Sequence, residues 1–176
     1  MRVQLSNQFE TPRAPDDTFA LLLDAPSIVH CVPGAELTSV EPDGSFKGRI
    51  SVKLGPVALK FNGAVEIADI DPAQRTATLK ARGADLQGRG GAHAVTTLSV
   101  EPSGAGSRVM LKTDLQLSGM VAQYGRAQGV IAAVSNEIVA QFSRNLAAAM
   151  AGGEPAPGQS EISGLTLAWR ALRGKA

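Results

Sequence analysis

The sequence predicts an α+β protein in which a curved antiparallel sheet of about seven strands surrounds one long C-terminal helix. Apolar and polar residues alternate in short runs between residues 3 and 117, which is typical of a sheet with one buried and one solvated face. Residues 119–150 contain no proline and repeat apolar side chains every three or four positions, as one face of a helix does. Two short helical segments follow the first strand, and this order of elements defines a helix-grip fold.

The first strand covers residues 3–9, where Val3, Leu5 and Phe9 alternate with polar side chains. Two short helices are expected between residues 16 and 32, because proline residues bound this segment on both sides. The other strands are expected at residues 35–41, 46–54, 57–67, 76–82, 94–100 and 109–117, separated by turns such as Pro42-Asp43-Gly44.

The final helix is the longest predicted element. Its apolar face comprises Met120, Tyr124, Ala127, Ile131, Val134, Ile138, Phe142 and Leu146. A helix of about 25 to 30 residues, rising ~1.5 Å per residue, would extend roughly 40 Å. Such a helix needs a broad apolar surface to lie on, and the predicted sheet supplies one.

The composition excludes several classes of protein. Seventeen basic and sixteen acidic residues give a net charge of +1, so the overall charge does not favour nucleic-acid binding. Cys31 is the single cysteine, which excludes an internal disulfide and fits a cytoplasmic protein. The N-terminus lacks the apolar segment of a secretory signal, and no apolar run approaches the ~20 residues that span a bilayer. We therefore expect a cytoplasmic protein whose membrane contact is peripheral.

The chain is expected to divide into three parts. Residues 1–151 form the helix-grip domain, residues 152–160 form a flexible linker rich in glycine and proline, and residues 161–176 form an amphipathic segment. The residues of this segment expected to bind a membrane or a partner are Leu165, Trp169, Arg170, Leu172 and Arg173. Docking of the segment onto its own domain is an open alternative.

Residues that could carry catalysis are few. His30 and His93 lie in no motif that pairs them with a nucleophile or a carboxylate, and no spacing of metal ligands occurs. Cys31 is expected to be a packed thiol and His93 a surface side chain. The glycine-rich run 88–91 is expected to be a turn rather than a phosphate-binding loop, because a strand and not a helix follows it. The sequence therefore predicts neither an enzyme nor a metal protein.

The inward-facing positions predict a different kind of site. The residues expected to contact a ligand are Phe46, Ile50, Val52, Leu59, Phe61, Leu79, Leu98, Tyr124, Gln128 and Ile131. Several other inward positions are small, namely Gly48, Gly63, Ala77, Ala81 and Ala94. Small residues beneath a long helix leave an elongated apolar void, whereas a solid core is the alternative that the sequence leaves open.

Several local strings carry a resemblance to a known family. They are Cys31-Val32-Pro33-Gly34-Ala35, Lys53-Leu54-Gly55-Pro56-Val57 followed by Phe61-Asn62-Gly63, Gly83-Ala84-Asp85 with Gly88 and Gly90, and Gly119 with Ala122-Gln123-Tyr124-Gly125-Arg126. In this order they resemble the carbon monoxide dehydrogenase G-subunit (CoxG) family of the START/Bet v 1-like (SRPBCC) superfamily. Residues Ala127-Gln128 depart from the pattern as an apparent insertion at the start of the long helix.

The resemblance implies a non-catalytic accessory protein without a covalent cofactor. It implies a bound lipophilic ligand, such as the respiratory quinone menaquinone, with Gln123, Tyr124 and Gln128 as candidates to orient a quinone carbonyl. The implied partners are the subunits of a carbon monoxide dehydrogenase or related molybdenum hydroxylase, at the inner face of the cell membrane. A cyclase or hydrolase of the same superfamily, and a pure assembly factor without a ligand, are the alternatives.

The solvated face of the predicted sheet carries a group of basic residues, Lys47, Arg49, Lys53 and Lys60. These side chains lie on two neighbouring strands at positions opposite in parity to the apolar ones. They are expected either to be simply solvated or to meet a partner or an anionic surface.

Overall fold

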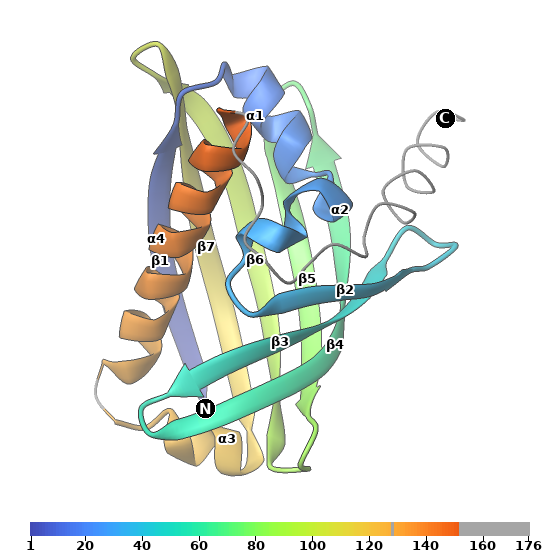
Figure 1. Cartoon of the computed structure of the whole chain (residues 1–176), viewed down its shortest axis with the longest axis vertical. Coiled ribbons are helices and arrows are strands. Elements are labelled where there is room, and N and C mark those ends of the chain that lie inside the picture. The colour runs from blue at the N-terminus through green and yellow to red at the C-terminus, as the bar shows by residue number, and fades with distance from the viewer. Residues whose placement is uncertain (128, 152–176) are drawn as a thin grey trace.

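The computed structural model describes residues 1–127 and 129–151, and it confirms the predicted helix-grip fold (Figure 1). The elements are β1 (Arg2–Thr11), α1 (Pro15–Leu22), α2 (Ala25–Ile28), the 3-10 helix η1 (Val29–Cys31), β2 (Ala35–Val40), β3 (Phe46–Leu54), β4 (Val57–Asp71), β5 (Thr76–Asp85), β6 (Gly90–Ser103), β7 (Gly106–Ser118), α3 (Gly119–Tyr124) and α4 (Val130–Met150). Each strand predicted from alternation is present, and the two short helices follow β1 as expected.

The seven strands form one antiparallel sheet in the order β1-β7-β6-β5-β4-β3-β2. Strands β2 to β7 pair consecutively as hairpins, and β1 closes the order by pairing with β7 from Arg2 to Thr11. In Figure 1 the β1, β7, β6 and β5 strands run along the long axis, while β2 and β3 cross in front of them. The sheet is therefore strongly curved, and its concave face is turned toward α4.

Three glycines lie side by side across the sheet where it bends. Gly48 of β3 pairs with Gly63 of β4, which in turn pairs with Gly83 of β5. A Cβ atom on Gly63 would collide with the backbone carbonyl oxygen of Arg82 on the neighbouring strand. Glycine at this position thus permits a close approach of two backbones that any larger residue would prevent.

The prediction of one helix over residues 119–150 is wrong, because the chain forms two helices there. α3 ends at Tyr124, and α4 begins at Val130 after Gly129, whose φ of +79° is left-handed and interrupts the helical backbone. At ~1.5 Å per residue, the 21 residues of α4 extend about 31 Å rather than roughly 40 Å. Gly129 carries the break because glycine adopts positive φ without steric cost.

Two separate hydrophobic clusters hold the domain together. The upper core packs α1 and the end of α4 onto the sheet and comprises Phe9, Phe19, Leu22, Leu23, Cys31, Ala77, Leu98, Val100, Val109 and Leu146. The lower core packs α3 and the start of α4 and comprises Leu54, Leu59, Phe61, Leu117, Val121, Ala122 and Ile131. In the upper core the rings of Phe9 and Phe142 meet edge to face, with centroids 5.6 Å apart.

The long helix α4 packs mainly against the edge strand β1 of the curved sheet. It packs against β1 on one side and against η1 and β3 on the other. Asn145 near its C-terminal end donates a hydrogen bond to the backbone carbonyl of Cys31 at 3.0 Å, which ties the helix to η1. Because α4 lies against β1 on one side and against η1 and β3 on the other, the strands between β1 and β3 face a space beneath it.

Some predictions fall outside the described residues. Gln128, the linker 152–160 and the segment 161–176 belong to this group, so the division of the chain and the roles of Leu165, Trp169, Arg170, Leu172 and Arg173 stay predictions. Within residues 1–127 and 129–151, no helix combines the length and the apolar character needed to cross a membrane.

Candidate ligand-binding site

A cavity of about 590 Å³ lies between the upper and lower cores, lined by the concave face of the sheet and by α4 and partly open to solvent. Protein interiors contain few voids larger than one water molecule, and at ~30 Å³ per molecule this cavity would hold about 20. Its volume falls within the ~300–1,000 Å³ of typical small-molecule sites. The interior is therefore not the solid core that the sequence left as an alternative.

The wall of the cavity is mostly aliphatic. The sheet contributes inward residues from all strands, such as Leu5 of β1 and Leu115 of β7, and α4 contributes Ile131, Val134 and Ile138. The wall is closed at one end by Ile28 and Val29 of the α2–η1 segment and at the other by Val121 of α3. A site of this composition binds apolar molecules through the removal of apolar surface from water.

Six of the predicted ligand-contacting residues line the cavity: Phe46, Ile50, Val52, Phe61, Leu79 and Ile131. Leu59 and Leu98 instead lie in the lower and upper cores, where they are 0% and 2% exposed. Tyr124 packs half-buried against the lower core, outside the cavity lining, and Gln128 is not among the described residues. Alternation identifies which residues of a strand point inward, but not whether an inward residue lies beside the cavity or within a core. Leu59 and Leu98 point inward at positions where the cores lie. Contact of any of these residues with a ligand stays a prediction.

The small inward residues contribute to the void as expected, with one exception. Gly48, Gly63, Ala81 and Ala94 line the cavity, whereas Ala77 is 1% exposed and lies within the upper core. Backbone forms the wall at the glycines, where no side chain covers the sheet. At Gly48 and Gly63 the cavity thus lies directly against the backbone of the sheet.

Three neutral polar side chains line the cavity among the described residues, and the sequence-based reasoning did not single them out. The Oγ1 atoms of Thr96 on β6 and Thr113 on β7 lie 2.8 Å apart on the inner face of the sheet. Ser135 of α4 donates its hydroxyl hydrogen to Oδ1 of Asn7 at 2.9 Å. The signal for the threonines was present, because alternation places both residues inward, but their pairing depends on a strand register that alternation does not define.

A second feature that sequence reasoning missed is an ion pair between Asp85 and Arg89, in the turn from β5 to β6. Nε of Arg89 donates to Oδ2 of Asp85 at 2.8 Å and Nη2 donates to Oδ1 at 3.0 Å. The guanidinium of Arg89 holds the pKa of the Asp85 carboxyl at about 2. Arg89 also donates to the backbone carbonyl of Ala58, and its own backbone carbonyl accepts a bond from the amide of Val121, so the pair joins β4 and α3.

This arrangement accounts for the glycine-rich run 88–91 as a turn. Gly88 and Gly90 have φ values of +73° and +132°, and the strand β6 begins at Gly90. No helix N-terminus follows, so the run lacks the amide cluster that would bind a phosphate. The turn instead connects β4 and α3 beside the lower core through the hydrogen bonds of Arg89.

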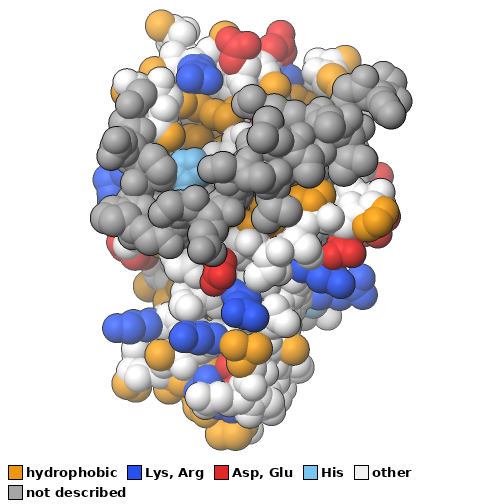
Figure 2. Space-filling view, turned by 45° about the vertical axis from the view of Figure 1, so that its right-hand side comes forward, with side chains coloured by type: hydrophobic (Ala, Val, Ile, Leu, Met, Phe, Trp, Pro, Cys, Tyr) orange, Lys and Arg blue, Asp and Glu red, His pale blue; other side chains and the backbone are white. Residues whose placement is uncertain are grey.

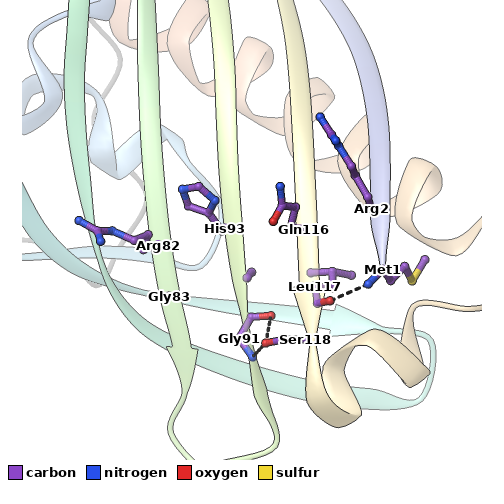
Figure 3. Close-up of a pocket in the computed structure, with 10 residues that line it drawn as sticks. Met1, Arg2, Arg82, Gly83, Gly91, His93, Gln116, Leu117 and Ser118 are labelled. Atoms are coloured by element: carbon purple, nitrogen blue, oxygen red, sulfur yellow. Dashed lines mark hydrogen bonds between the residues drawn. The ribbon is translucent and has the colours of Figure 1, made fainter.

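The outer face of the sheet carries a second depression, of about 630 Å³ (Figure 3). The side chains of Arg82, His93, Gln116 and Arg2 project along it from β5, β6, β7 and β1. Arg2 is held by an ion pair with Asp114, and His93 is exposed, as expected of a surface histidine. The depression is open to solvent and its lining mixes these polar and charged side chains with apolar surface, so it is less suited than the interior to an apolar molecule.

Basic side chains also gather on the surface of the sheet. Figure 2 shows Lys and Arg side chains in a band across the lower half of one face. On β3 and β4, Lys47, Arg49, Lys53 and Lys60 are all exposed, and Nζ of Lys47 lies 3.6 Å from a carboxylate oxygen of Glu41. Exposed pairs of this kind contribute little to stability. Both expectations for these residues, a simply solvated face and a surface that meets a partner or an anionic surface, stay predictions.

Burial shifts the pKa values of two further reactive groups, Cys31 and His30. Cys31 is fully buried, and burial raises the pKa of its thiol, which favours the neutral form. Burial lowers the pKa of the neighbouring His30, which favours its neutral form as well. Within the described parts of the chain, no group of His, Cys, Asp and Glu side chains is arranged to hold a metal ion.

Fold and cavity together define a Bet v 1-like helix-grip protein with an apolar interior of ligand size. The chain belongs to the carbon monoxide dehydrogenase G-subunit (CoxG) family, whose sequence model matches residues 8–151. The resemblance seen in the sequence is thereby confirmed over nearly the whole described part of the chain. No curated protein matches it.

Solved structures of other proteins share the fold. A conserved protein from Geobacillus kaustophilus is 18% identical with a TM-score of 0.72, covering 85% of this chain and 96% of its own. The Zhui aromatase/cyclase from Streptomyces sp. R1128 is 15% identical with a TM-score of 0.55, covering 88% and 100%. The major latex-like protein 151 of ginseng, Panax ginseng, is 15% identical with a TM-score of 0.53, covering 84% and 97%. At such identities the likeness concerns the fold alone.

Proposed function

We propose that this protein is a non-catalytic accessory protein that binds a lipophilic ligand in the cavity beneath α4. The ligand is a respiratory quinone such as menaquinone, and the protein carries it to a molybdenum hydroxylase of the carbon monoxide dehydrogenase type. The observation that carries the proposal is the apolar cavity of about 590 Å³ in a chain of the CoxG family. A cavity of this size and lining suits a flat ring with an apolar tail.

The chemistry of the lining supports a carrier rather than an enzyme. A general acid or base must lie within hydrogen-bond reach of the reacting group. Among the described lining residues, the ones with ionisable side chains are Glu36, Lys47, Arg49 and Arg82, and all four are exposed and have the parity of the outer face. The aromatase/cyclase among the structural neighbours is therefore a parallel in fold alone.

The direct test is analysis of lipid bound to protein purified from its own host. Native mass spectrometry and solvent extraction should recover one lipophilic molecule per chain from the wild-type protein. The double variant Ala81→Leu, Ala94→Leu, which fills the cavity, should carry much less, whereas Ala84→Leu on the outer face of β5 should carry the wild-type amount. Equal lipid content in all three proteins, or none in the wild type, would refute the carrier function.

Attachment to the membrane and to the dehydrogenase is the second part of the proposal. We assign it to the segment 161–176, where Trp169 and the neighbouring arginines have the composition of an interfacial anchor. Deleting residues 164–176 should leave bound lipid unchanged while reducing the fraction of protein that sediments with host membranes. Unchanged sedimentation of the truncated protein would contradict this role.

A further inference from the structure

The inner face of the sheet carries one pair of hydroxyl groups in otherwise apolar surroundings. Thr96 and Thr113 are cross-strand partners on β6 and β7, with their Oγ1 atoms 2.8 Å apart. In the same cross-strand row, Leu5 flanks Thr113 on β1 and Leu79 flanks Thr96 on β5. The inward residues before and after Thr96 on its strand are Ala94 and Leu98, so a polar point lies at the centre of an aliphatic wall.

The two hydroxyl groups of this pair carry one more donor hydrogen than the contact between them uses. Two hydroxyl groups carry two hydrogens, and the contact between them uses one as donor. The second hydrogen has no acceptor among the described residues, and both side chains line the cavity. A hydroxyl donor in apolar surroundings is unfavourable unless it is hydrogen-bonded, so the pair is suited to an acceptor placed inside the cavity.

Ser135, on the opposite wall, differs in this respect. Its hydrogen is already donated to Oδ1 of Asn7 at 2.9 Å, and Nδ2 of Asn7 donates in turn to Oδ1 of Asn136 at 2.7 Å. Ser135 therefore presents lone pairs to the cavity but no donor. Among the neutral polar side chains of the described lining, the available donor belongs to the threonine pair.

We propose that the Thr96–Thr113 pair is the subsite that binds the acceptor oxygen of the lipophilic ligand, a ring carbonyl in the case of a quinone. This inference rests on the proposed function and adds the position and chemistry of the polar contact. It places that contact on the inner strands β6 and β7 of the sheet, away from the start of the helical region where Tyr124 and Gln128 were expected to provide it. The pair positions the ligand and selects molecules that carry an acceptor.

The test compares the binding of two probes with the same carbon skeleton to protein stripped of lipid. 2,3-Dimethyl-1,4-naphthoquinone has two carbonyl acceptors, and 2,3-dimethylnaphthalene has none. In equilibrium dialysis the variant Thr96→Val, Thr113→Val should bind the quinone about three- to tenfold more weakly, as expected for one lost hydrogen bond. It should bind the hydrocarbon as well as or better than the wild type does. Thr96→Ser, which keeps a hydroxyl, should retain quinone binding, and Thr97→Val on the exposed face is the matched control.

The outcomes separate this inference from the proposed function. If the wild type binds neither probe, the carrier function and the subsite are both wrong. If it binds both probes and the valine variant loses neither or both equally, the subsite is wrong and the carrier function stands. The infrared carbonyl stretch of the quinone bound to the wild type gives a second readout that does not depend on how the variant folds. A shift to lower frequency relative to the same quinone in hexane supports the subsite, and an unshifted band refutes it.

Discussion

Enlarging a side chain that lines the cavity should raise the free energy of unfolding, whereas the same change in a packed core should lower it. Ala77 and Ala81 both point inward from β5, but Ala77 is 1% exposed within the upper core while Ala81 lines the cavity. Ala81→Leu adds three carbon atoms, which at ~0.8 kcal/mol per buried carbon gives at most ~2.4 kcal/mol. Ordering the leucine side chain removes about 0.5–1 kcal/mol. We therefore expect Ala81→Leu to raise the free energy of unfolding by about 1.5 kcal/mol.

The same substitution at Ala77 should have the opposite effect. Ala77 is 1% exposed and does not line the cavity, and overpacking a core costs about 1–3 kcal/mol. Urea unfolding followed by far-ultraviolet circular dichroism, on protein stripped of lipid, measures both variants against the wild type. Removal of lipid is essential, because a displaced ligand would lower the stability of Ala81→Leu for an unrelated reason. If Ala81→Leu is destabilised as much as Ala77→Leu, the interior is a packed core and the assignment of the cavity as a binding site is refuted.

Two further predictions concern the elements that bound the cavity. The pKa of about 2 for Asp85 lies below its unfolded value near 3.9, so its contribution to stability is complete above pH ~5 and disappears as the pH falls toward 2. Asp85→Asn should therefore be less stable than the wild type at pH 7, with the difference in urea midpoint narrowing between pH 5 and pH 2; a difference independent of pH would refute the ion-pair account. Gly129→Ala should lose about 1–2 kcal/mol because φ is +79° there, whereas Gly129→Asn, which tolerates this conformation and can cap α4, should lose less. Equal losses in the two Gly129 variants would show that the left-handed turn does not limit stability.

Most of the sheet was predictable because one physical signal governs it. A strand with one buried face must alternate, so the inward positions of Phe46, Ile50 and Val52 followed from the sequence and proved to line the cavity. The break between α3 and α4 was not predicted, because apolar spacing continues through it. Gly125 and Gly129 were the available signal, and the left-handed φ of Gly129 outweighs the favourable spacing around it.

The polar features of the site could not be obtained in the same way. Alternation places Thr96 and Thr113 on the inner face, but only the register of β6 against β7 brings their hydroxyls to 2.8 Å. The ion pair of Asp85 with Arg89 depends likewise on a turn geometry with two left-handed glycines. Contacts set by register and turn conformation are properties of the assembled sheet, and residue type alone does not indicate them.

The size of the void argues that it serves binding. Native interiors contain few voids larger than one water molecule, whereas this cavity, which is partly open to solvent, has about 590 Å³. That volume is typical of small-molecule sites rather than of packing defects. The fold supports it because the upper and lower cores lie at either end, while α4 packs mainly against the edge strand β1 and, on its other side, against η1 and β3. A lipophilic ligand that fills the space would recover contacts that the glycine and alanine positions leave unmade, and its binding free energy would add directly to the stability of the folded chain.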